Sequence, residues 1–67
     1  MKLSARNVLK GTVVEINTGA TSHVRLDVGG NIVTSSITNE AVRELGLNKG
    51  MTAYAVIKAS DVMVAVD

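Results

Sequence analysis

The chain has 67 residues and a net charge of +1, from seven Lys and Arg against six Asp and Glu. The length allows a single domain over residues 1–67, and the charge is not that of a protein that binds duplex nucleic acid through many phosphates. The absence of cysteine excludes disulfides and thiolate metal sites, and one histidine cannot build a zinc centre.

We predict three strands, separated by glycine turns, in the first half of the chain: Val8–Asn17, Thr21–Val28 and Asn31–Ile37. In the second run apolar and polar residues alternate, so that Val24, Leu26 and Val28 share one face. The Gly29-Gly30 pair that follows is typical of a hairpin.

A short helix is predicted next, with Thr38 as its N-cap, Glu40 in its first turn and Gly46 at its end. Two strands complete the chain, Met51–Ile57 and Val62–Val66. Three strands, a helix and two strands are the order of an all-β, five-stranded OB-type barrel with one short helix between strands 3 and 4. An SH3-like barrel is the alternative, with less reason to carry a helix there.

Small size and an unusual apolar pattern predict self-association. A compact 7.0 kDa chain exposes about 4,000 Å² of surface, and burial by so small a core barely offsets the entropy of ordering the chain. The last predicted strand, Val62–Val66, is apolar on both faces, although a barrel has only one interior. A neighbouring copy that covers the second face would supply the missing stability.

Neither catalysis nor single-strand binding is indicated. The sequence shows no legible Ser/His/acid arrangement, no paired carboxylates and no phosphate-binding P-loop, and we expect no enzyme. Single-stranded nucleic acid requires aromatic stacking platforms and a basic groove, whereas Tyr54 is the only aromatic residue. With no signal peptide and no membrane-spanning run, we expect a cytoplasmic protein that binds neither membrane nor nucleic acid.

Hydrogen-bond donors gather in two polar segments, SARN at residues 4–7 and KASD at residues 58–61. Hydroxyl, amide and turn N–H groups together with the cations Arg6 and Lys58 would suit a small dianion that only accepts hydrogen bonds. On the residues alone a plainer interpretation stays open: Arg6 pairs with Asp67 or Glu15, Lys58 pairs with Asp61, and Ser60 lies in an ordinary turn.

Four segments together, SARN, GTVVEINTGA, SSITNEAVRELGLNKGM and VIKASDVMVAV, resemble the molbindins. These are small cytoplasmic molybdate-binding proteins built from one TOBE domain, an OB-type barrel. The resemblance spans essentially the whole chain. It implies a homohexamer, a trimer of dimers, with oxyanion sites at subunit interfaces.

The resemblance also implies two classes of oxyanion site. The first joins residues of the SARN segment of one subunit to the Lys-Ala-Ser turn of another, and its members here are Ser4, Arg6, Asn7, Lys58, Ala59 and Ser60. The second uses the turn after the first strand, here Gly19, Ala20, Thr21 and Ser22. Thr21-Ser22-His23 departs from the family's pattern of small residues, and His23 adjoins this turn.

A site made only of donors suits molybdate, an unprotonated tetrahedral dianion. Phosphate keeps a proton part of the time near neutral pH, and its hydroxyl would lack an acceptor at a cost of roughly 1–3 kcal/mol. Tungstate matches molybdate in size and charge, so we expect no discrimination between them. The predicted function is storage or buffering of molybdate or tungstate, without an organic cofactor or a metal ion ligated by side chains. The alternative is an oligomeric TOBE-like structural or regulatory module without tight oxyanion binding.

Overall fold

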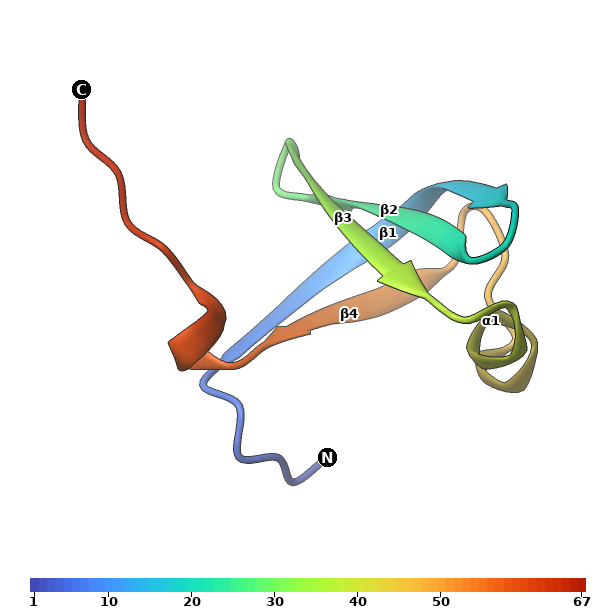
Figure 1. Ribbon diagram of the computed structural model, residues 1–67, viewed down its shortest axis with the longest axis horizontal. Coiled ribbons are helices and arrows are strands. Elements are labelled where there is room, and N and C mark those ends of the chain that lie inside the picture. Colours follow the sequence, from blue (N-terminus) through green and yellow to red (C-terminus); the bar gives the residue numbers. More distant parts are fainter.

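A computed structural model describes residues 1–67. One antiparallel sheet has the strand order β3-β2-β1-β4, and a short helix and a single 3-10 turn complete the chain (Figure 1). The elements are β1 (Asn7–Thr18), β2 (Ser22–Val28), β3 (Asn31–Ile37), α1 (Asn39–Leu45), β4 (Thr52–Ile57) and η1 (Ala59–Asp61). The three N-terminal strands, the helix and the fourth strand are confirmed, each within a residue or two of its predicted bounds.

The long strand β1 joins the two parts of the sheet, because its two halves pair with different neighbouring strands. Its N-terminal half pairs with β4, from Asn7↔Ile57 to Thr12↔Thr52, and its C-terminal half pairs with β2. Gly11 lies at the crossover, where an added Cβ would come within 2.6 Å of the Asp27 carbonyl oxygen. The sheet therefore curls around a small core of four buried residues: Val13, Val24, Leu26 and Ala55.

Both ends of the helix follow the predicted signals. The Thr38 hydroxyl accepts a hydrogen bond from the Ala41 N–H at 3.0 Å, which satisfies one of the unpaired amides of the first turn. Gly46 adopts the left-handed conformation, with φ of 63°, and so closes the last turn without the penalty that a Cβ would bring. No helix of the protein is both long and apolar enough to span a membrane.

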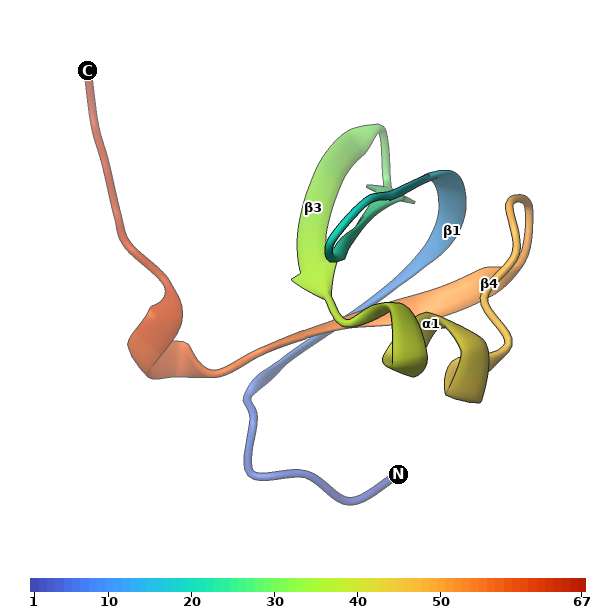
Figure 2. The ribbon, with the colours of Figure 1, turned by 45° about the vertical axis from the view of Figure 1, so that its right-hand side comes forward.

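The prediction of a fifth strand over Val62–Val66 is wrong for the single chain. The sheet has four strands, and the residues after Asp61 run away from it as an extended segment (Figures 1 and 2). An apolar, β-branched pattern favours extended backbone, but a strand forms only where a ladder partner lies alongside. The predicted five-stranded barrel is therefore an open four-stranded sheet in one chain.

The open sheet leaves much apolar surface uncovered. Met63, Val64 and Val66 are 94%, 89% and 92% exposed. The accessible surface is 5204 Å², about 1,200 Å² more than a compact chain of this mass exposes. The radius of gyration, 12.5 Å, likewise exceeds the roughly 11 Å expected for this length.

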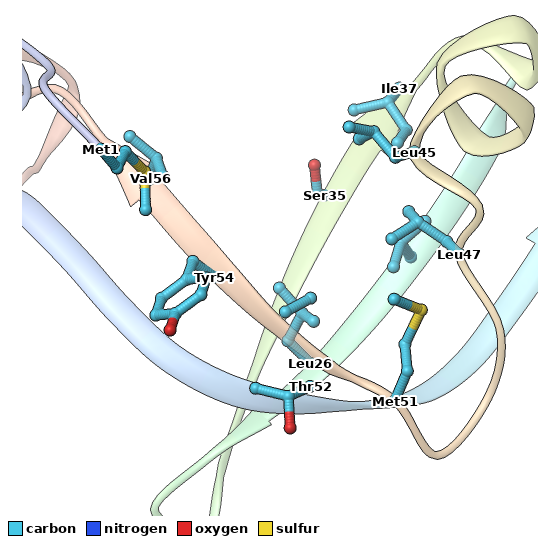
Figure 3. Close-up of a pocket in the computed structure, with 12 residues that line it drawn as sticks. Met1, Leu26, Ser35, Ile37, Leu45, Leu47, Met51, Thr52, Tyr54 and Val56 are labelled. Atoms are coloured by element: carbon cyan, nitrogen blue, oxygen red, sulfur yellow. The ribbon is translucent and has the colours of Figure 1, made fainter.

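An apolar groove of about 450 Å³ lies between the free edges of β3 and β4. Figure 3 shows Ser35 on β3 across from Tyr54 on β4, with Leu47 and Met51 from the connection between α1 and β4 at one end. A second hollow of about 300 Å³ lies between the same two strands. This is where a fifth strand would close the barrel.

Candidate functional site

Pairing of β1 with β4 brings the two predicted donor segments to one end of the sheet. Asn7, the last residue of SARN, lies opposite Ile57, and its side-chain Nδ2 donates to the Ile57 carbonyl oxygen at 3.2 Å. Because the strands are antiparallel, Arg6 and Lys58 follow this pair at the same end of the β1–β4 ladder. Residues separated by about 50 positions in the sequence are thus adjacent in one chain.

Both cations of this ladder end are free of ion pairs. The single ion pair of the protein joins Arg25 Nη1 to Glu15 Oε2 at 3.4 Å. The plainer interpretation, in which Arg6 pairs with Asp67 or Glu15 and Lys58 with Asp61, is therefore wrong for this structure. Arg6 and Lys58 are both exposed, so two positive charges with no internal partner stand at the same end of the sheet.

The turn that follows β4 adds backbone donors. In η1 the Asp61 N–H donates to the Lys58 carbonyl oxygen at 2.9 Å and the Val62 N–H to that of Ala59 at 3.3 Å. The preceding N–H groups, of Ala59 and Ser60, begin the turn and have no partner within it. Ser4 and Ser60 are exposed. None of the cavities of the single chain is lined by any of these residues, so the donors converge on no enclosed space.

The second predicted region, the turn between β1 and β2, does form a cavity within one chain. Its volume is about 350 Å³, and it is lined by Asn17, Thr18, Gly19, Ala20, Thr21 and His23. Three of the four residues predicted for the second class of site, Gly19, Ala20 and Thr21, belong to this lining. Ser22 does not, because its side chain points to the opposite face of β2 and is completely buried.

Asn39, which the sequence reasoning missed, ties this turn to the helix. Its Nδ2 donates to the Gly19 carbonyl oxygen at 2.9 Å, while its Oδ1 accepts the hydroxyl of Ser22 at 2.6 Å. Asn39 thereby takes up the Gly19 carbonyl and, at 3.5 Å, that of Ala20, while the Gly19 N–H donates to the Thr21 carbonyl oxygen at 2.9 Å. No local pattern marks this role, since Asn39 lies 17 positions after Ser22 in the chain.

One carboxylate lies near the cavity. Asn17 donates its Nδ2 to Glu15 Oε1 at 2.6 Å, and this hydrogen bond, with help from Arg25, lowers the pKa of Glu15 below its ordinary value. Glu15 therefore stays ionised and accepts hydrogen bonds from both Asn17 and Arg25. Elsewhere, no three His, Cys, Asp or Glu residues cluster so as to hold a metal ion.

Comparisons with known proteins agree on one family. The TOBE domain model matches residues 3–64. A probable molybdenum-pterin-binding protein of Haemophilus influenzae is 51% identical over the full length of both chains. The structure of a molybdate-binding protein from Sporomusa ovata superposes with a TM-score of 0.94 at 34% identity, covering 98% of this chain and all of that one.

A third relative is longer. The cytoplasmic molybdate-binding protein ModG, in a form with molybdate bound, is 54% identical with a TM-score of 0.89. The match covers 94% of this chain and 46% of the ModG chain. A fold of this similarity over nearly every residue, at such identities, indicates common ancestry rather than a shared architecture alone. The chain belongs to the TOBE domain family and, within it, to the small molbindins that its SARN and IKASDVM segments resemble.

Proposed function

We propose that this protein binds molybdate and tungstate, without catalysing a reaction, and stores or buffers the oxyanion in the cytoplasm. The observation that carries the proposal is the pair of unmatched cations, Arg6 and Lys58, at one end of the β1–β4 ladder among hydroxyl and N–H donors. The printed descriptions of the relatives, one of which was crystallised with molybdate, support the same ligand.

The chemistry of the donors fits a dianion without a proton. Guanidinium, ammonium, hydroxyl and backbone N–H groups all donate, and charge-assisted bonds of this kind are the strong ones. Molybdate and tungstate offer four acceptor oxygens. A partly protonated phosphate leaves its hydroxyl without an acceptor, at roughly 1–3 kcal/mol, which is about 10- to 150-fold in affinity.

We further propose that the complete first-class site exists only between copies of the chain, in a homohexamer built as a trimer of dimers. Three features favour assembly: the donors of the ladder end enclose no cavity, the groove between β3 and β4 is open, and the apolar segment after Asp61 is exposed. That segment from another copy fits the groove as a fifth strand. The surplus surface of about 1,200 Å² is of the size that one partner contributes to a stable interface.

Calorimetry of the assembled protein tests the ligand. Molybdate and tungstate are titrated in parallel with phosphate and sulfate into the wild type, Lys58→Met and the control Lys49→Met. Lys49 lies in the connection between α1 and β4, next to Gly50, which bonds to Val13 in the middle of β1. We expect similar, tight binding of the first two anions, a loss on Lys58→Met and none on Lys49→Met.

Equal heats for molybdate and phosphate would overturn the proposal. In that case, an oligomeric assembly that remains intact would favour the alternative function, a structural or regulatory TOBE module, which the exposed apolar surface also supports.

A further inference from the structure

The cavity at the β1–β2 turn has one side chain able to carry positive charge, that of His23. The other lining residues are uncharged: Asn17, Thr18, Gly19, Ala20 and Thr21. A dianion held by neutral donors alone loses its hydration without a countercharge, which is costly even in a half-open site. The residue at position 23 therefore decides how much charge the second class of site offers.

No other cation of the chain belongs to the lining of this cavity. Arg25, two residues further along the same face of β2, is paired with Glu15 on the neighbouring strand. Directly across from His23 lie Asn17 on β1 and Ser36 on β3, both uncharged. The helix α1 carries Glu40, Arg43 and Glu44 and bonds to β2 through Ser22 and to the turn through Asn39, but none of its residues lines the cavity.

Two side chains at the turn, those of Ser22 and Asn17, already donate to other residues, which leaves fewer donors for a ligand beside His23. Ser22 is buried and gives its hydroxyl hydrogen to Asn39, and Asn17 gives an amide hydrogen to Glu15. Thr18, Thr21 and His23 are then the side chains left to face a ligand in the cavity. Of these only an imidazole gains a second N–H donor and a full positive charge on protonation.

We propose that His23 is the charged donor of the turn cavity, and that this second oxyanion site therefore binds its dianion with uptake of a proton. The proposal rests on the proposed function, since it assumes that the turn cavity takes an oxyanion. The anion's oxygens accept the hydrogen bonds, so the turn residues act as donors and not as metal ligands. Binding at the turn strengthens as the pH falls through the range in which imidazoles gain their charge.

The first-class site provides an internal control. Guanidinium and ammonium groups stay charged across the neutral range, so binding by Arg6 and Lys58 is constant where binding by His23 changes. Two classes of site in one assembly are thereby told apart by their pH dependence. The wild type should gain about two- to fivefold in affinity at the turn between about pH 8 and about pH 6, the range for a contact between partly exposed charges.

The test titrates tungstate into the full-length assembly at both pH values, in two buffers of different ionisation enthalpy so that proton uptake is measured directly. His23→Gln keeps a neutral donor and should abolish the pH dependence and the proton uptake. His23→Arg carries a permanent charge and should bind tightly at both pH values. His23 is exposed, so we expect neither substitution to disturb the fold.

Crystals grown with tungstate at the two pH values separate the ways of failing. Tungsten at the turn with equal occupancy and affinity at both pH values, and in His23→Gln, overturns the role of His23 and leaves the second site standing. No tungsten at the turn under any condition, with the first-class sites filled, overturns both the second site and this inference. An anion absent from every position overturns the proposed function itself.

Discussion

The two ends of strand β1 differ in how far a single chain completes them. At its C-terminal end the turn is tied down by Ser22 and Asn39, and a cavity forms within the chain. At its N-terminal end the ladder with β4 stops among donors, with Arg6 and Lys58 unpaired and nothing enclosed around them. We call the first end closed, because its turn is bonded to the helix although the cavity beside it opens to solvent, and the second end open. The closed end is poor in charge and the open end is rich in charge.

The difference shows what local bonding supplies and what it leaves to assembly. A turn closes when a nearby side chain satisfies its backbone groups, and Asn39 does this for the β1–β2 turn. The ladder end stays open in one chain, since Arg6 and Lys58 are exposed and neither has an internal partner. Such a site becomes complete when a neighbour supplies walls and a dianion supplies the countercharge.

Removal of residues 62–67 should have the largest effect. Without the exposed apolar segment, the groove between β3 and β4 has no strand to fill it, and light scattering should show the mass of a single truncated chain. Tungstate binding at the first-class site should disappear with it. Removal of Asp67 alone serves as the control and should change neither. A truncated chain that still assembles would disprove the role given to this segment.

Single substitutions of Arg6 or Lys58, at the open end of β1, should have the second largest effect. Arg6→Met and Lys58→Met should each lower molybdate affinity by about 10- to 100-fold, the value of a charge-assisted hydrogen bond. Mixing the two variants after unfolding and refolding should restore about a quarter of the sites, because random assembly pairs intact residues from different copies at that frequency. No recovery in the mixture would mean that each chain supplies both cations to the same site.

Loss of the Asn39 side chain should disturb only the closed end. Asn39→Ala leaves the buried Ser22 hydroxyl without its acceptor, which should lower the free energy of unfolding by about 1–3 kcal/mol in urea at fixed protein concentration. Ser22→Ala should cost less, and Asn48→Ala, an exposed control in the loop after α1, should cost almost nothing. Equal losses for Asn39 and Asn48 would contradict the link between the turn and the helix.

The smallest expected effect is a change in the pKa of Glu15. Glu15 has a lowered pKa, chiefly through the Asn17 hydrogen bond, so its contribution to stability is present above its unfolded pKa and is lost as the pH falls through its lower, folded pKa. Asn17→Ala should raise the pKa of Glu15 toward its ordinary value of 4.5, as followed by carboxylate NMR. Thr18→Ala is the control. A pKa that stays put in Asn17→Ala would shift the cause to Arg25.

Local signals predicted most elements because their causes are local. The alternation in Val24–Val28, the Thr38 cap and the Gly46 end each depend on residues within one turn or one strand, and the structure has all three. The candidate site could not be predicted from local signals of this kind. The resemblance to a family identified SARN and KASD as segments of the site. Nothing in their spacing predicted that Arg6 and Lys58 lie at the same end of one ladder.

The sequence by itself determined four of the five predicted strands, the helix and its two ends, and which residues can donate hydrogen bonds, because these follow from side-chain chemistry over a few positions. Tertiary structure alone decided that β1 pairs with β4 and so unites two segments about 50 residues apart, that Ser22 faces inward to Asn39, and that Val62–Val66 stays unpaired. Each of these depends on a partner distant in the chain, and in the last case the sheet of one copy does not provide it.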